Sequence, residues 1–119
     1  MVEFAFVGTL FSLIILGILE FGVAVWQKNS AAADAREGAR YAVVRSANMT
    51  GHVATADSVR NYVRTKTSLD AAGVRVYTSW IPDNTPGSVV KVSVAHSVPR
   101  RGAFIRAHVD SATAEMTIY

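Results

Sequence analysis

The sequence predicts an α+β fold: a long N-terminal hydrophobic α-helix that continues into a small domain with a short helix and a three-stranded antiparallel sheet. Three observations predict this fold class. An almost uncharged apolar run opens the chain, an alanine-rich stretch with helical spacing follows it, and three later stretches alternate apolar and polar residues. Half of the 119 residues are hydrophobic, and this excess is concentrated near the N-terminus.

The apolar run covers residues 4–26, and Glu20 is its only charged residue. At about 1.5 Å of rise per residue, a helix of this length crosses a hydrocarbon core of about 30 Å. We therefore divide the chain into two parts. Residues 1–27 are the hydrophobic half of the long helix, and residues 28–119 are a small α+β headgroup that includes the amphipathic half of the helix.

The long helix is expected to continue to about Ser46, because no proline interrupts this part of the chain. Its second half has one face of small residues at helical spacing, namely Ala31, Ala35, Ala39, Ala42, Val43 and Ser46. The neighbouring charged residues lie on a different side. Such a helix is longer than a small headgroup can cover, so its first half needs a membrane or neighbours like itself.

A second, shorter helix is expected after a break at residues 46–51. Thr55 or Asp57 is its predicted N-cap, because both side chains accept hydrogen bonds from the first free backbone N–H groups of a helix. Val59, Tyr62 and Val63 share one face, and residues 71–73 mark its end.

Three strands are predicted from alternating residues at 74–79, 90–95 and 112–118. The alternation indicates a sheet with one dry and one wet face. Turn-forming residues at 82–87 should join the first two strands as a hairpin, and residues 99–110 should form a longer loop. The dry face needs a cover, and the alanine face of the long helix allows close approach.

Composition excludes several function classes. The formal charge is +3, but only Arg100 and Arg101 are adjacent, so we expect no specific nucleic-acid binding. The chain has no cysteine, which excludes disulfides and thiolate zinc sites. No signal-peptide cleavage site follows the apolar run, so we expect either a natural start at Met1 or prior removal of a basic leader.

Three motifs stand at regular distances in the first part of the chain: VEFA at residues 2–5, GILEFG at 17–22 and AREGARYA at 35–42. Together they resemble the TadE-like family, pilin-related proteins of the tight-adherence (Tad/Flp) systems. The resemblance is strong over the first 45 residues, and the rest of the chain matches in general form. It implies a type IV pilin-like fold.

The resemblance also implies partners and a location. A prepilin peptidase would cut a short basic leader, and assembly machinery would extract the chain from the inner membrane into an extracellular filament of identical subunits on the cell surface. In related pilins an acidic residue is fifth in the mature chain, whereas Glu3 is third here. Either one or two mature residues precede Met1, or processing differs in this branch.

Two carboxylates are candidate assembly residues, because a charge at the edge of an apolar segment is costly unless it is paired. Glu3 is expected to pair with the terminal amine of an adjacent subunit; the alternative is a flanking residue at the membrane surface. Glu20 either pairs with a basic residue of a neighbouring subunit or reaches water beside Lys28.

Two further groups of residues are candidates for packing. We expect five residues to pack against other helices in a filament core: Phe4, Gly8, Gly17, Phe21 and Gly22. The alternative for the three glycines is that they have no packing role and are merely tolerated in a membrane helix. Contacts between the long helix and the headgroup are expected of Arg36, Glu37, Arg40 and Tyr41. The alternative for these charged residues is a solvated surface with pairs one helical turn apart.

No catalytic motif is present, so we expect no enzyme, no cofactor and no metal site. The three histidines have no metal-binding spacing and stand beside no recognisable nucleophile motif. Asn48, Met49 and Thr50 form a glycosylation sequon in an expected loop, a tripeptide that also occurs by chance.

Two functions fit these observations. The first is a structural pilin subunit that polymerises through its N-terminal helix into a type IV-like, Tad/Flp-related pilus for adhesion or surface attachment. The alternative is a membrane-anchored accessory or minor pilin-like protein of a tight-adherence secretion system, which does not form the bulk of the filament.

Overall fold

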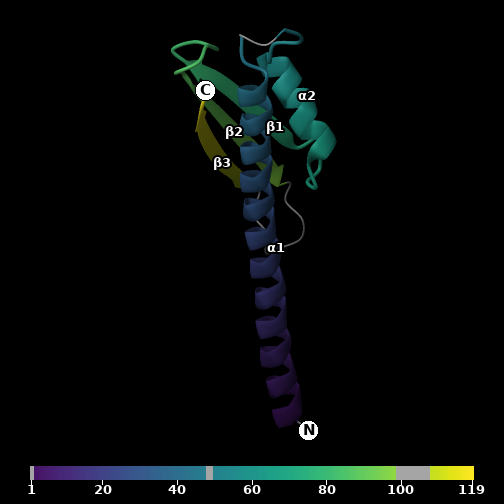
Figure 1. Ribbon diagram of the computed structural model, residues 1–119. Coiled ribbons are helices and arrows are strands. Elements are labelled where there is room, and N and C mark those ends of the chain that lie inside the picture. Colours follow the sequence, from purple (N-terminus) through teal and green to yellow (C-terminus); the bar gives the residue numbers. More distant parts are fainter. Residues whose placement is uncertain (1, 48–49, 99–107) are drawn as a thin grey trace.

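The computed structural model describes residues 2–47, 50–98 and 108–119. The elements in chain order are α1 (Val2–Val44), α2 (Ala56–Lys66), β1 (Val74–Ile81), β2 (Val89–Val98) and β3 (His108–Thr117). The molecule measures 74 × 23 × 19 Å, because the first half of α1 extends far beyond the other elements (Figure 1). The predicted α+β fold, with its long helix, short helix and three antiparallel strands, is confirmed.

Helix α1 is continuous over 43 residues and ends where the sequence predicted a break. Its last turn is tight, since the backbone N–H of Arg45 donates to the carbonyl of Ala42 at 3.3 Å. The following chain is held by two backbone hydrogen bonds, from Ala47 to Asn84 and from Ala54 to Arg45. Asn48 of the sequon, with Met49, lies outside the described residues.

Helix α2 begins at Ala56, and Thr55, one of the two candidates, is its N-cap. The Thr55 hydroxyl accepts from the N–H of Ser58 at 3.2 Å, and the Ser58 hydroxyl accepts from the N–H of Thr55 at 2.9 Å. This reciprocal capping box satisfies two of the free donors at the helix start. Val59 and Val63 are buried, as their predicted face requires.

The predicted end of the second helix was wrong: α2 stops at Lys66, not at residues 71–73. Thr67 has extended backbone angles, and its hydroxyl donates to the carboxylate of Asp34 on α1. The same hydroxyl accepts from the N–H of Leu69 at 3.1 Å. These local bonds replace the helical ones and direct the buried Leu69 towards the core.

The three strands form one antiparallel sheet in the order β1-β2-β3. The predicted hairpin joins β1 to β2, with Val76 opposite Val94 and Trp80 opposite Val90. Its turn contains Gly87 at φ +93°, a backbone conformation that glycine adopts without strain.

Asp83 organises this turn. Its carboxylate accepts hydrogen bonds from the hydroxyls of Thr85 and Ser88 and from the Thr85 N–H. Because these bonds stabilise the charged form, the hydroxyl of Thr85 first and then that of Ser88, they lower the pKa of Asp83 below its usual value.

All three strands extend beyond the alternating stretches that predicted them. The clearest difference is β3, which begins at His108, inside the expected loop of residues 99–110. Residues 108–110 pair with residues 96–98 of β2 because backbone pairing continues along the strand whatever the side-chain pattern. Residues 99–107 lie outside the described part of the chain.

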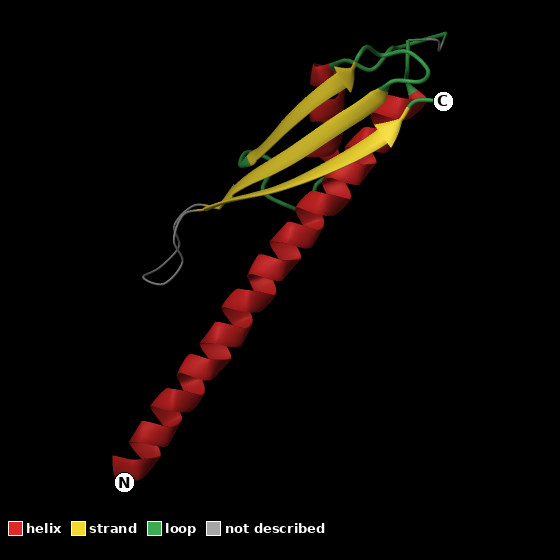
Figure 2. Ribbon diagram, turned by 90° about the vertical axis from the view of Figure 1, so that its left-hand side faces the viewer, coloured by secondary structure: helices red, strands yellow, loops and turns green. Residues whose placement is uncertain are grey.

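The sheet lies along the second half of α1, and α2 packs beside α1 near β1 (Figure 2). The dry face of the sheet meets the alanine face of α1. The core between them is built from small side chains, chiefly Ala31, Ala35, Ala39, Ala42, Val59, Val63, Val74, Val90, Val92 and Val94. The opposite face is polar, with an ion pair between Lys91 and Glu115 at 2.8 Å and a hydroxyl pair between Ser93 and Thr113.

Candidate functional site

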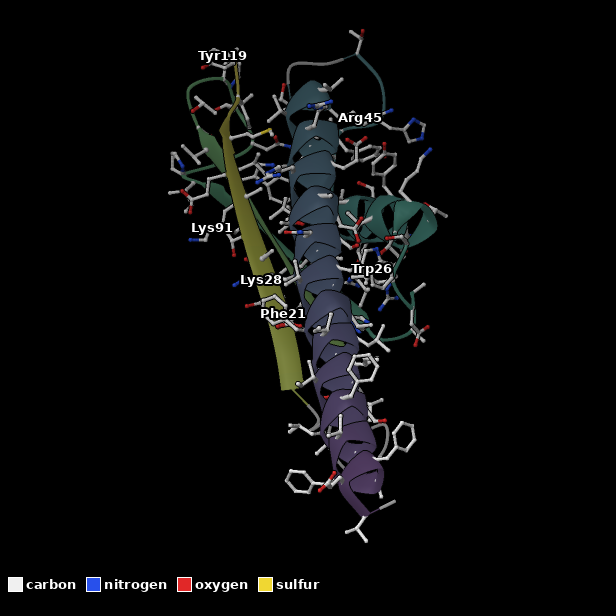
Figure 3. The ribbon with its side chains drawn as sticks, turned by 90° about the horizontal axis from the view of Figure 1, so that it is seen from below. Phe21, Trp26, Lys28, Arg45, Lys91 and Tyr119 are labelled. Atoms are coloured by element: carbon white, nitrogen blue, oxygen red, sulfur yellow. The ribbon has the colours of Figure 1, made fainter. Side chains whose placement is uncertain are left out.

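The first half of α1 exposes large apolar side chains around its whole circumference. An 18-residue window of this helix has a mean hydropathy of 2.3, and none of it is buried within the molecule. Phe4 is 83% exposed, Phe21 73% and Trp26 52%. Side chains project from both sides of this part of the ribbon, which runs up the picture (Figure 3). Exposed apolar surface of this extent marks a contact with lipid or with other protein chains.

The hydroxyl groups in this segment are satisfied internally. Thr9 donates to the carbonyl of Ala5 and Ser12 donates to the carbonyl of Gly8, both at 2.8 Å. Bonds of this kind remove the cost of placing a hydroxyl in hydrocarbon or in a dry helix bundle. The apolar segment therefore suits an environment without water.

Glu3 and Glu20 are both exposed, and neither forms an ion pair within the described residues. Seventeen residues separate them, about 26 Å along the helix axis. This separation is close to the thickness of a hydrocarbon core; Glu3 directly precedes the apolar segment of residues 4–26, and Glu20 lies inside it, nearer its far end. Glu3 also lies in the first turn, where the helix dipole favours a negative charge.

Gly8, Gly17 and Gly22 have open surroundings, since no atom beyond their own local helix lies within 4 Å of the point where a Cβ would stand. At about 100° per residue, Gly8 and Gly17 lie on opposite sides of α1, and Gly22 lies about 40° from Gly8, on the same side. In a bundle of helices Gly8 and Gly22 would face one neighbour and Gly17 would face another.

Gly38 was absent from the predicted site residues, yet α2 and β2 approach α1 closely at this residue. It is buried, and a Cβ there would lie 2.8 Å from Cγ2 of Val63 and 3.2 Å from Cγ1 of Val92. A signal was present in the sequence. Gly38 follows Ala31 by seven residues, so it lies on the alanine face.

A cluster of polar and aromatic side chains joins α1 to α2. The Tyr62 hydroxyl donates to Oε1 of Glu37 at 2.8 Å, and the rings of Tyr62 and Tyr41 stack with centroids 4.2 Å apart. The Arg45 guanidinium lies 4.1 Å from the centroid of Tyr41. The hydrogen bond to Glu37 is the main cause that raises the pKa of Tyr62, and partial loss of water around the hydroxyl adds to it.

The four predicted contact residues thus have different positions. Glu37 and Tyr41 contact α2, whereas Arg36 and Arg40 are exposed and form no ion pair or side-chain hydrogen bond with the residues that the structure describes. A further link between α1 and the segment after α2 is the bond from Thr67 to Asp34, which sequence reasoning missed. Neither residue stands in a motif that would have indicated it.

The part of the chain that the structure describes holds no group of three His, Asp or Glu side chains close enough to bind a metal ion.

The N-terminal part of this chain is similar to a known family. Residues 1–40 match the TadE-like protein family. This match confirms the resemblance that the motifs at residues 2–5 and 17–22 predicted, and it covers the whole apolar segment. TadE-like proteins are structural proteins associated with Tad pili, and the exposed, membrane-length helix fits membrane anchoring. No curated protein and no solved structure matches the chain.

Proposed function

We propose that the chain is a structural pilin subunit, which polymerises through its hydrophobic N-terminal helix into an extracellular, Tad/Flp-related pilus used for adhesion or surface attachment. One observation carries the proposal. The apolar segment of α1 is exposed on all sides, while the rest of the same helix is already packed against its own headgroup. The first half is therefore the part that is left to bind other chains.

Burial of this segment keeps the assembled filament stable in water. Each large apolar side chain that passes from water into a helix bundle contributes about 1.5–3 kcal/mol. In the membrane this surface is already covered by lipid, so extraction requires that neighbouring helices replace the lipid. Residues 1–27 form the filament core in this proposal, and residues 28–119 form the outer headgroup.

The two carboxylates set the register of the bundle. Glu3 pairs with the terminal amine of an adjacent subunit, which neutralises both charges in the core, and Glu20 pairs with a basic residue of a neighbouring subunit. A carboxylate that is left without a partner in such a core is strongly destabilising. Phe4, Gly8, Gly17, Phe21 and Gly22 pack against neighbouring helices.

A prepilin peptidase and the pilus assembly machinery act on the chain before it joins the filament, and the chain itself has no enzymatic role. The support for these steps is the match of residues 1–40 to the TadE-like family. The same apolar helix also suits a permanent membrane anchor. A membrane-anchored accessory or minor pilin-like protein is therefore the second candidate function.

Electron microscopy and mass spectrometry of material sheared from expressing cells separate these two functions. Thin filaments composed mainly of this chain are the expected result. Recovery of the chain only in the membrane fraction would reject the filament subunit and support the accessory protein.

A matched pair of variants tests the role of Glu3. Glu3→Gln should reduce the yield of sheared filaments while the amount of chain in the membrane stays the same. Glu115→Gln removes an exposed carboxylate from the polar face of the sheet and should leave the yield unchanged. An unchanged yield for Glu3→Gln would exclude the proposed salt bridge, even if filaments of this chain exist.

A further inference from the structure

A pocket of about 220 Å³ lies in the headgroup where α2 runs beside β1. It is lined by Arg60, Arg64, Arg75, Val76 and Tyr77. The sequence does not indicate it, because no two of these arginines are adjacent and they form no basic block. Two come from one side of α2, four residues apart, and the third comes from β1.

The pocket carries more positive charge than its surroundings neutralise. Arg60 pairs with Asp57 at 2.8 Å, and both side chains are well exposed to water. Within the described residues, neither Arg64 nor Arg75 has a carboxylate within 4 Å. Three guanidinium groups therefore face one partly solvated carboxylate, and an anion in the pocket would relieve their mutual repulsion.

Arg64 is held in place by the strand edge. Its Nη2 and Nε donate to the carbonyl oxygen of Val74 at 3.2 and 3.4 Å. A guanidinium that is fixed in this way keeps further N–H groups available for a ligand. It also loses less conformational entropy when a ligand binds.

The bond from Arg64 to Val74 also indicates which backbone groups of β1 point to the free edge of the sheet, beside the pocket. The Val74 carbonyl accepts from Arg64 and points away from β2, whereas the carbonyl of the preceding residue, Gly73, points towards β2 and accepts from the Ser97 N–H. In an antiparallel ladder the outward-pointing groups recur at every second residue, so the N–H of Val76 also points to the free edge. This explains why Val76 lines the pocket although its side chain is buried.

We propose that this pocket binds a phosphate or sulfate group carried on a sugar ring. Guanidinium groups present paired N–H donors that match the oxygens of these anions, and the Val76 N–H adds a neutral donor. Tyr77 is 60% exposed at the pocket and offers an apolar ring face to the sugar. A single pocket suits one anionic group, whereas a nucleic-acid strand would need a series of cationic positions for its successive phosphates.

Calorimetric titration of the full chain in nonionic detergent micelles tests the proposal. The probes are glucose 6-phosphate, glucose 6-sulfate, glucose and inorganic phosphate. We expect binding of at least one of the two sugar esters, no binding of glucose, and weaker binding of inorganic phosphate. The ester that binds more tightly shows whether the pocket prefers a phosphate or a sulfate group. Binding should weaken as salt concentration rises.

Two charge variants locate the site. Arg75→Gln should weaken binding by roughly tenfold or more, the factor expected for one charge-assisted hydrogen bond. Lys66→Gln removes one charge from α2 outside the pocket lining and should leave the affinity unchanged. Arg75 is exposed and forms no ion pair with any described residue, so the variant should keep the near-ultraviolet circular dichroism of the parent chain.

Four results would overturn the proposal. They are no binding of either ester, an equal loss of affinity in Lys66→Gln, inorganic phosphate that binds as tightly as the esters, and a single-stranded oligonucleotide that binds more tightly through Arg75. The last result would assign the pocket to nucleic acid. None of these results depends on whether the chain forms filaments.

Discussion

Replacement of Gly38 by alanine should destabilise the headgroup, although alanine is the better helix former. The added methyl group would lie 2.8 Å from Cγ2 of Val63, closer than carbon atoms approach without displacement. It would also lie 3.2 Å from Cγ1 of Val92. Both valines are at most 2% exposed, and a β-branched side chain has little freedom to rotate away.

The magnitude follows from two opposed effects. Insertion of an extra methyl group into a packed core costs about 1–3 kcal/mol. Replacement of glycine by alanine in a helix interior gains about 1 kcal/mol. We therefore expect a net loss of roughly 1 kcal/mol in the free energy of unfolding.

The assay is urea unfolding of the full chain in detergent micelles, followed by near-ultraviolet circular dichroism. This signal reports the packing of Trp80, Tyr41 and Tyr62, whereas the far-ultraviolet signal would be dominated by the micelle-bound half of α1. The control is Gly17→Ala, because no atom lies within 4 Å of the added methyl group. It should leave headgroup unfolding unchanged.

A second variant tests the cause of the loss. Val63→Ala removes the side chain that Gly38→Ala would contact, so the double variant should be more stable than the sum of the two single losses predicts. A Gly38→Ala chain that is about 1 kcal/mol more stable than its parent would refute the reasoning, since helix propensity alone would then decide the outcome.

Acid should weaken the headgroup through Asp83. The pKa of Asp83 is lower in the folded chain, so its contribution is present above about pH 4, the unfolded value, and is lost as pH falls through the lowered pKa. Asp83→Asn should flatten this part of the pH profile of the unfolding free energy, and an unchanged slope would contradict the role. Tyr62→Phe removes the hydroxyl that bonds Glu37 but keeps the ring, so we expect a loss of about 1 kcal/mol in urea unfolding. In the Tyr62→Phe background, Glu37→Gln should lower the free energy of unfolding by less than it does in the parent chain. Strictly additive losses would show that the two side chains do not interact. A chain shortened to residues 28–119 should give a dispersed proton NMR spectrum in water, whereas residues 45–119 should not, because they lack the helix that covers the dry face of the sheet. A folded 45–119 fragment would show that the sheet needs no such cover.

The sequence predicted the long helix, the hairpin and the cover of the sheet because each depends on a strong local period. The alanines at 31, 35, 39 and 42 repeat at helical spacing, and all four are fully buried. Alternation in β1 and β2 likewise predicted which side chains face the core. Each of these elements buries one face, so its apolar residues recur with the period of the helix or strand, and that period is visible in the sequence.

Other features escaped prediction because they depend on residues that meet only in three dimensions. The end of α2 is set by a bond between Thr67 and Asp34, which are 33 residues apart. The arginine pocket joins residues from a helix and a strand whose relative position no local pattern records. Gly38 is an intermediate case. Its place on the alanine face could be predicted from the sequence, but its close contact with Val63 could not.

Side-chain size divides α1 into two halves with different partners. Large side chains in the first half keep neighbouring backbones at a distance, and they point in every direction, so many partners or a membrane can cover them. Small side chains in the second half let α2 and the sheet approach the helix backbone, as the surroundings of Gly38 show. Because the described part of α1 has neither a proline nor a break between these halves, the headgroup has no hinge where it joins the apolar segment. Any contact that fixes the rotation of the first half about its axis must therefore also fix the direction in which the arginine pocket and the polar face of the sheet point.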